Sequence, residues 1–330
     1  MNLSTILEEY KTYRNNQDKT IDDFLDEIIP PFYNSRCDEK TRLYFCNHIF
    51  STKIDENITI LNQMRDNCLQ TIKKDLPEKQ MKKLTHKIWL TKKEDGHLPN
   101  QAMIDILKNH YSELIDFKHY LWCNNTKIGK QIIDLMEIDG LDIELHEICE
   151  LENCKGSEMF NICLKNNLFA NACDIARIQV VYKYGGIYSD FGWGMTKYIS
   201  TYLKNFDIMF NGENAEWCKG YISHNVIYSK KPDHIIFSEM LSYLENKKFL
   251  IDFNKEGNLF CMIEIVSPRF IMTSIPALCK NDKLITLENN VFTFGRHHNF
   301  SHTNGLYGSR KTNGNMEDIN TEINNYINNL

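Results

Sequence analysis

The sequence predicts an α/β fold in which helices flank a mostly parallel sheet, with a helical subdomain ahead of it. Strand-like runs alternate with helical patterns from Leu84 to about residue 146. An apolar helical run over 170–184 is followed by two glycines and a short strand-like run that ends at Asp190. Residues 1–80 show helical patterns only. Strand–helix alternation of this kind is typical of sheets covered by helices on both faces.

The first part of the chain has the signals of short helices. Thr20 stands where a residue capping the run 21–29 is expected, and apolar residues in 56–75 recur at steps of three and four. Both patterns are typical of amphipathic helices. We therefore expect a helical extension over residues 1–80 and one α/β domain over 81–330.

The α/β domain begins with a regular alternation of elements. Because ligands of such sheets bind beyond the carboxyl ends of the strands, we expect Asp190 to face a ligand site. The strands are predicted at 84–90, 117–122 and 143–146, and the intervening helices at 99–111 and 129–137.

The helical run 170–184 is apolar on most sides, so burial is expected. Asp174 and Arg177 are three residues apart in it and therefore share one face. Two interpretations are open: a surface ion pair, or buried polar groups that a ligand requires, since burying such groups is otherwise costly. Gly185 and Gly186 end the helix, as glycine commonly does.

This stretch resembles the core signature of the DXD-containing sugar-transferase families, the GT-A glycosyltransferases. These include the clostridial glucosylating toxins and the initiating mannosyltransferases. The resemblance implies a GT-A, Rossmann-like fold and a hexosyltransferase that retains configuration and uses a nucleotide-sugar donor, for which we expect a UDP-sugar. The matching residues are Asp174, Arg177, Gly185, Gly186, Tyr188 and Asp190.

Further residues match the families' motifs. Trp89, three residues after His86, stands where the families have a tryptophan that stacks on the base, although a core tryptophan would fit the same strand. Asn225 matches an asparagine near the donor sugar. By the same resemblance Asp190 is the carboxylate nearest the donor diphosphate, while Asp174 and Arg177 hold the sugar hydroxyls and the phosphate edge. Tyr188 is expected in the donor site.

The sequence departs from the families at Gly192, which replaces the second aspartate of the DXD motif, usually a metal ligand. Mn²⁺ or Mg²⁺ is still expected, with Asp190 as one ligand. His302, in an HxxG pattern, is expected to supply the other, with two nearby histidines as alternatives. Cationic side chains could instead hold the phosphates without metal, Arg310 foremost. The alternative histidines are His297 and His298, and the other cationic side chains are Arg296 and Lys311.

Three functions are open, and Gly192 is the sequence feature that indicates the second of them. The first is an active transferase that moves a sugar to a protein or glycan acceptor. The second is a degenerate transferase that binds a nucleotide-sugar or a partner without turnover. The third is an interaction protein that acts through residues 1–80, a segment that could also contact a membrane peripherally or simply pack on the domain.

The composition of the chain limits which classes of partner and which cellular compartment are expected. The formal net charge is −6 and no basic block occurs, which argues against nucleic-acid binding. Eleven cysteines without a CxxC pair are typical of reduced thiols in a reducing compartment. The N-terminus lacks the pattern of a signal peptide, and no apolar run has the length of a transmembrane segment. We therefore expect a protein that is cytoplasmic or is delivered into a host cell.

Overall fold

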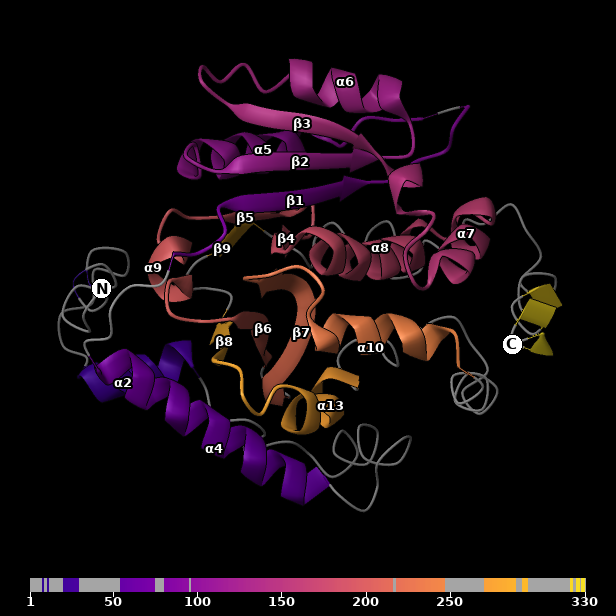
Figure 1. The fold of residues 1–330 in the computed structure, drawn as a ribbon. Coiled ribbons are helices and arrows are strands. Elements are labelled where there is room, and N and C mark those ends of the chain that lie inside the picture. Colours follow the sequence, from indigo (N-terminus) through magenta and orange to yellow (C-terminus); the bar gives the residue numbers. More distant parts are fainter. Residues whose placement is uncertain are drawn as a thin grey trace.

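A computed structural model describes residues 20–29, 54–74, 80–94, 96–215, 218–246, 270–288 and 293–295, with isolated positions near each end. Its centre is a seven-stranded sheet in the order β3-β2-β1-β4-β7-β6-β8 (Figure 1). The strands are β1 (Leu84–Trp89), β2 (Lys118–Cys123), β3 (Asp142–Glu147), β4 (Gly186–Ser189), β6 (Ile208–Ala215), β7 (Cys218–Ser229) and β8 (Leu284–Glu288).

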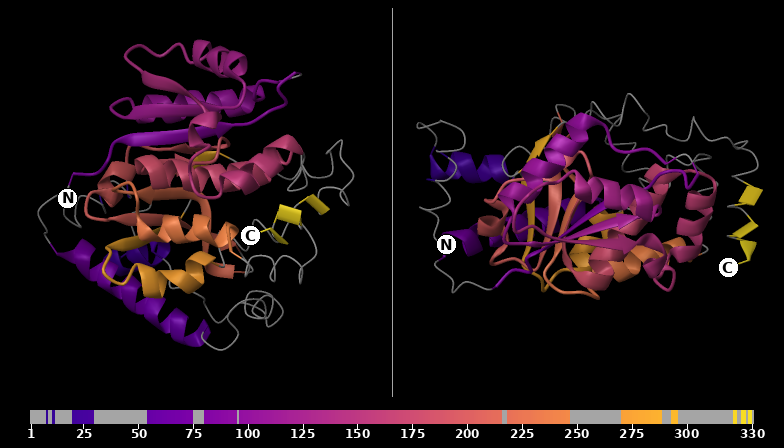
Figure 2. Two further views of the ribbon diagram at one scale, coloured as in Figure 1. Left: turned by 45° about the vertical axis from the view of Figure 1, so that its right-hand side comes forward. Right: turned by 90° about the horizontal axis from the view of Figure 1, so that it is seen from above.

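The sheet is mostly parallel, which confirms the predicted fold class. β1 pairs in parallel with β2 and β4, β2 with β3, and β6 with β8, whereas β7 runs antiparallel to β4 and β6. The arrowheads of β1, β2 and β3 point the same way in Figure 1, and Figure 2 shows the twist of the sheet from two further directions. The carboxyl ends of β1 and β4 therefore lie side by side.

Helices cover both faces of the β1–β2–β3 part of the sheet. Alternate residues of β2 reach the two faces: Leu121 packs in the cluster formed with α5 and α6, and Trp122 packs in the cluster formed with α8. The helices around the sheet are α5 (Gln101–Glu113), α6 (Thr126–Asp134), α7 (Ser157–Lys165), α8 (Phe169–Tyr184), α9 (Ile199–Leu203), α10 (Ile235–Leu244) and α13 (Phe270–Leu278).

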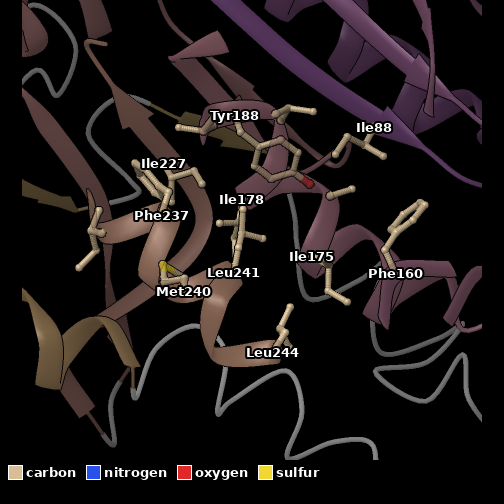
Figure 3. Close-up of a cluster of buried hydrophobic side chains, with 14 of the residues drawn as sticks. Ile88, Phe160, Ile175, Ile178, Tyr188, Ile227, Phe237, Met240, Leu241 and Leu244 are labelled. Carbon is tan, nitrogen blue, oxygen red and sulfur yellow. The ribbon is translucent and has the colours of Figure 1, made fainter. Parts of the chain in front are cut away.

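Helix α8 is largely buried, as its apolar sequence predicts. Its residues 174–181 are all buried. Ile175 and Ile178 lie in one apolar cluster with Tyr188 of β4 and Leu241 of α10 (Figure 3). Packing of α8 against the sheet and against α10 thus fixes the orientation of the helix, and with it the direction of its polar side chains.

The two described helices of the N-terminal extension, α2 (Ile21–Ile28) and α4 (Ile54–Lys73), lie at the β8 end of the sheet (Figure 1). The Thr20 side chain accepts from the backbone N–H of Asp23, whose own side chain accepts in return from the Thr20 backbone, which is a capping box. Apolar residues of both helices share one cluster with β6 and β8. The boundary near residue 80 remains our proposal.

Several elements differ from the predicted positions. Helix α6 begins three residues earlier than predicted because the side chain of Asn125 caps it, accepting from the backbone N–H of Ile128. Helix α7 and strand β8 were not predicted. A small second sheet joins β5 (Trp193–Met195) to β9 (Thr293–Gly295). Pairing of β5 with a strand a hundred residues away has no local signal in the sequence.

The double glycine between α8 and β4 gives a first prediction. Gly186 has φ of 87°, and a Cβ there would lie 2.6 Å from the backbone oxygen of Leu84. Gly186→Ala should therefore lower the free energy of unfolding by more than about 2 kcal/mol, measured by denaturant titration. Gly140 is the matched control, because its φ is 75° but a Cβ there meets nothing within 4 Å. Equal losses in the two alanine variants would contradict the close approach to β1.

Candidate active site

The predicted site residues meet where β4 ends. Asp190 directly follows β4, and its backbone N–H donates to the carbonyl oxygen of Asn225 on β7 at 2.8 Å. The Asp190 Oδ1 accepts from the Tyr188 hydroxyl at 2.7 Å and lies 3.0 Å from Nη2 of Arg177. Tyr188 and Arg177 therefore hold the same carboxylate oxygen, while 17% of the Asp190 side chain remains exposed.

Helix α8 supplies the polar groups that face Asp190. Nη2 of Arg177 also lies 2.7 Å from Oδ1 of Asp174, and Nη1 donates to the carbonyl oxygen of His224 at 3.3 Å. Nε2 of His224 approaches the same Asp174 oxygen at 3.2 Å, without the direction of a hydrogen bond. The sequence spacing of Asp174 and Arg177 therefore corresponds to a buried ion pair, not a surface one.

The charges in this cluster are set by burial and by each other. Burial alone would lower the pKa of Arg177, but Asp190, Tyr188 and Asp174 outweigh it and raise that pKa, so the guanidinium stays protonated. Burial, aided by Arg177, lowers the pKa of His224, which keeps this imidazole neutral near pH 7. One guanidinium thus lies between two acidic side chains and links them, while its other nitrogens donate to the backbone carbonyls of Cys173 and His224.

Asn225 lies next to this cluster on β7. Its side chain is 3% exposed, and neither amide atom has a hydrogen-bond partner within the described part of the chain. Leaving a buried amide unpaired costs about 1–3 kcal/mol, so such a group calls for an explanation. Hydrogen bonds to a ligand hydroxyl would satisfy both its oxygen and its nitrogen.

Trp89 ends β1 beside the cluster and is partly exposed. Its indole N–H donates to the carbonyl oxygen of His97 at 3.0 Å, and its ring centre lies 5.0 Å from that of Phe191. Phe191 itself packs in the cluster of apolar residues formed with α5 and α6. The indole is therefore held by one edge, and part of its surface remains available.

A cavity of about 700 Å³ lies beyond the carboxyl ends of β1, β2 and β3. Thr91, Asn124 and Glu147 follow or end these strands and line it, together with Phe169 at the start of α8. Asp190 and Trp89 do not line it.

Residues 50–209 match the family described as "Glycosyltransferase sugar-binding region containing DXD motif". The chain is therefore similar to this family over that stretch. This match confirms the resemblance to the DXD-containing sugar transferases over the region that contains Trp89, Asp174, Arg177 and Asp190.

Two solved structures resemble the chain more distantly. One is entitled "PaToxG Glycosyltransferase" (TM-score 0.45, 14% identity, covering 72% of this chain and 79% of that chain). The other is "Crystal structure of the UDP-bound glycosyltransferase domain from the YGT toxin" (TM-score 0.36, 9% identity, covering 58% and 67%). No curated protein matches the sequence.

The C-terminal residues expected in this candidate site fall outside the described residues. They are His302, Arg310 and the alternatives Arg296, His297, His298 and Lys311. Within the described residues, Gly192 lies in the turn after Asp190, so Asp190 is the carboxylate that this turn offers to a cation. No helix in the described part of the chain is long and apolar enough to cross a membrane.

Three further residues of types that can bind a metal lie close together. His234 immediately precedes α10, and Cys279 and Asp282 follow α13. Nδ1 of His234 accepts from the backbone N–H of Ile236 at 3.3 Å, so the ring proton is on Nε2, which points to Asp282 Oδ2 at 3.1 Å. A metal at Nε2 would require the other tautomer. Burial also raises the pKa of the Cys279 thiol. These hydrogen bonds are those of a helix cap: His234 caps α10, and Asp282 orients its ring.

Two residues next to the site were missed by sequence reasoning. His224 precedes Asn225 on β7, and no pattern distinguishes it. Lys87 is fully buried in β1, and its ammonium donates to Ser189 Oγ and to the carbonyl oxygens of Asp190 and Trp193. A lysine inside an otherwise buried parallel strand was the available signal, since such residues are rarely buried without a partner.

His86 buttresses the double glycine from β1. Its Nδ1 accepts from the Trp122 indole N–H at 3.2 Å, which places the ring proton on Nε2, and Nε2 donates to the carbonyl oxygen of Gly185 at 2.8 Å. Burial lowers the pKa of His86 to about 3. The imidazole is therefore neutral in the folded protein, and protonation of Nδ1 would break the bond to Trp122.

This pKa predicts a pH dependence of stability. Between about pH 6.5 and about pH 3, the unfolded chain binds a proton that folded His86 excludes. The stabilisation is complete above pH 6.5 and falls as pH falls, by about 1.4 kcal/mol per pH unit. Denaturant titrations of wild type and His86→Gln from pH 7 to pH 4.5 should show their difference in unfolding free energy shrinking at this slope. A constant difference would contradict a neutral buried imidazole.

Proposed function

We propose that the protein is an active glycosyltransferase that moves a hexosyl group from a UDP-sugar to a protein or glycan acceptor with retention of configuration. The observation that carries the proposal is the position of Asp190. It lies at the carboxyl end of β4, next to that of β1, with Arg177 and Asp174 beside it, inside the region that matches the glycosyltransferase family.

The chemistry assigns separate tasks to these residues. Breaking the bond between the sugar and the diphosphate leaves negative charge on the diphosphate, which the site must stabilise more in the transition state than in the ground state. Arg177 is protonated, and we propose that it contacts phosphate or sugar oxygens of the donor. Asp174 and Asp190 hold its orientation. The Asn225 amide has no hydrogen-bond partner among the described residues and can contact sugar hydroxyls, and Trp89 offers a ring for the base.

We also propose Mn²⁺ or Mg²⁺ as cofactor, because carboxylate oxygen suits either ion. Bound there, the metal would supply positive charge to the diphosphate. Asp190 fits as one ligand, since part of its carboxylate is exposed. Gly192 provides no second ligand, and we propose His302 for that place. Arg310 is proposed as a phosphate contact, and Tyr188 as support for Asp190, to which its hydroxyl donates.

A degenerate transferase is the second candidate, and two observations favour it. Gly192 leaves the turn without its second acid, and Oδ1 of Asp190 is already engaged by Arg177 and Tyr188. Such a protein would bind a nucleotide-sugar without turnover. A panel of UDP- and GDP-sugars, tested for hydrolysis and for heat-stabilisation with and without Mn²⁺, separates the candidates. Nucleotide release supports the transferase, and stabilisation without release supports the binding module.

The predicted role of Trp89 is tested by binding. Trp89→Ala should weaken binding of free UDP, measured by calorimetry, by about 1–3 kcal/mol, because a stacked base loses its partner ring. Trp89→Phe is the matched control, since it keeps a flat ring and should retain most of the affinity. Equal affinities of wild type and Trp89→Ala would show that the indole only packs against Phe191.

The acceptor class and the cellular compartment are also proposals. We propose a protein or glycan acceptor, and activity in the cytoplasm of the producing cell or of a host cell. A peripheral membrane contact through residues 1–80 is part of this proposal. Vesicle sedimentation of the full chain, compared with a variant lacking these residues, tests it.

A further inference from the structure

Lys87 lies beneath the turn that carries Asp190. Its side chain extends from the middle of β1 and is 0% exposed. Nζ donates to Ser189 Oγ at 2.6 Å, to the carbonyl oxygen of Asp190 at 3.0 Å, and to the carbonyl oxygen of Trp193. These are three acceptors for the three N–H groups of an ammonium. All three acceptors belong to the end of β4 and the turn 190–193.

No other part of the described chain balances this cation directly. No carboxylate among the described residues lies within 4 Å of Nζ, and its hydrogen-bond partners are the hydroxyl and the two carbonyls. Burial lowers the pKa of Lys87 to about 7, against the opposing effect of Asp190. His110 and His119 are also close enough to be affected, and burial lowers the pKa of both, so they are neutral. The cost of burying the ammonium is therefore offset mainly by the turn.

The turn depends in return on this cation. The backbone N–H of Trp193 donates to the Asp190 carbonyl oxygen at 2.9 Å, and Lys87 binds the carbonyl groups at both ends of the same turn. The turn includes Gly192, whose backbone lacks a side chain to restrict it. β5 follows, where His110 Nδ1 accepts from the Met195 backbone N–H at 3.1 Å. The hydrogen bonds from Lys87 to Ser189, Asp190 and Trp193, which we call the clamp, thus restrain the turn in place of a larger side chain or a bound ligand.

We propose that Lys87 is a positioning residue of the donor site, which fixes the turn 190–193 and thereby aims the Asp190 carboxylate at the donor diphosphate. In a turn that lacks the second acid of the DXD motif, the buried Lys87 side chain provides the hydrogen bonds that hold the turn. This inference rests on the proposed function for the role of Asp190, but the clamp itself can be tested without turnover.

The test compares Lys87→Met with wild type by backbone hydrogen exchange and by kinetics. Methionine keeps the volume and removes the charge and all three hydrogen bonds, so it leaves buried acceptors without their donor and should also lower the free energy of unfolding. We expect faster exchange in peptides that cover 190–195, and a kcat lower by about a hundredfold with a much smaller change in the KM for the donor. Lys83→Met is the matched control, since Lys83 forms an exposed ion pair with Asp116 and should change neither quantity.

Two further measurements keep the outcomes separate. Ser189→Ala removes one acceptor and leaves the cation, so it should increase exchange in the same peptides to a smaller extent, and it replaces Lys87→Met if that variant does not fold. Unchanged exchange at 190–195 in the variant tested overturns the clamp. Faster exchange with unchanged kcat overturns the positioning role. If wild type neither releases nor binds any nucleotide, the proposed function fails, while the exchange result still decides on the clamp.

Discussion

Arg177→Met should lower the free energy of unfolding by about 3–5 kcal/mol and abolish turnover. The guanidinium lies between Asp174 and Asp190, and the side chains of Arg177 and Asp174 are 7% and 9% exposed. Removing it leaves two acidic groups close together without their cation, and breaking a buried ion pair from one side is strongly destabilising. Denaturant titration measures the stability, and release of UDP from the donor measures turnover.

The control for this variant is an ion pair on the surface. Lys118 and Glu144 are 2.7 Å apart, but their side chains are 42% and 48% exposed. Lys118→Met should therefore change the free energy of unfolding far less than Arg177→Met does. If Arg177→Met were no more destabilising than Lys118→Met, the cluster would not depend on its central cation, and the geometry around Asp190 would need another explanation.

Asp190→Asn should reduce turnover by about a hundredfold or more while the protein stays folded. The amide keeps the shape of the carboxylate and can still accept from the Tyr188 hydroxyl, and Arg177 keeps its contact with Asp174. What the variant loses is the charge that orients Arg177 and binds a metal, and removal of one preorganised electrostatic group typically costs 10²–10³ in kcat. Steady-state UDP release with the best donor measures the effect.

Asp142→Asn is the control for this charge change. Asp142 is exposed at the start of β3, at the opposite end of the strands from Asp190, so its substitution should leave turnover unchanged. Wild-type turnover in Asp190→Asn would show that the site has been assigned to the wrong carboxylate.

The sequence predicted the layout around Asp190 because the signals there are local. Glycine has to follow α8, since Gly185 and Gly186 both have positive φ, and a short strand-like run then ends at the acid. The spacing of Asp174 and Arg177 placed them on one face of a helix, and the apolar composition of 170–184 predicted its burial. Periodicity and turn chemistry were sufficient for these features.

The contacts that join distant segments could not be predicted in the same way. Lys87 and Ser189 are 102 residues apart, and Arg177 and His224 are 47 residues apart, so each contact exists only after the sheet order is known. The cap of α6 by Asn125 was a local signal that the sequence analysis did not use. The proposed roles of His302 and Arg310 remain predictions, because both residues lie outside the described part of the chain.

A crystal structure with a UDP-sugar and Mn²⁺ bound is the most direct test that Asp190 and Arg177 form the donor site. The account predicts the diphosphate at the exposed edge of these two side chains, the base stacked on Trp89, and the sugar within hydrogen-bond distance of the Asn225 amide. A metal between Asp190 and the diphosphate, with His302 as second ligand, would support the proposed cofactor site. A donor bound elsewhere, with Asp190 and Arg177 contacting only each other and Asp174, would contradict the account.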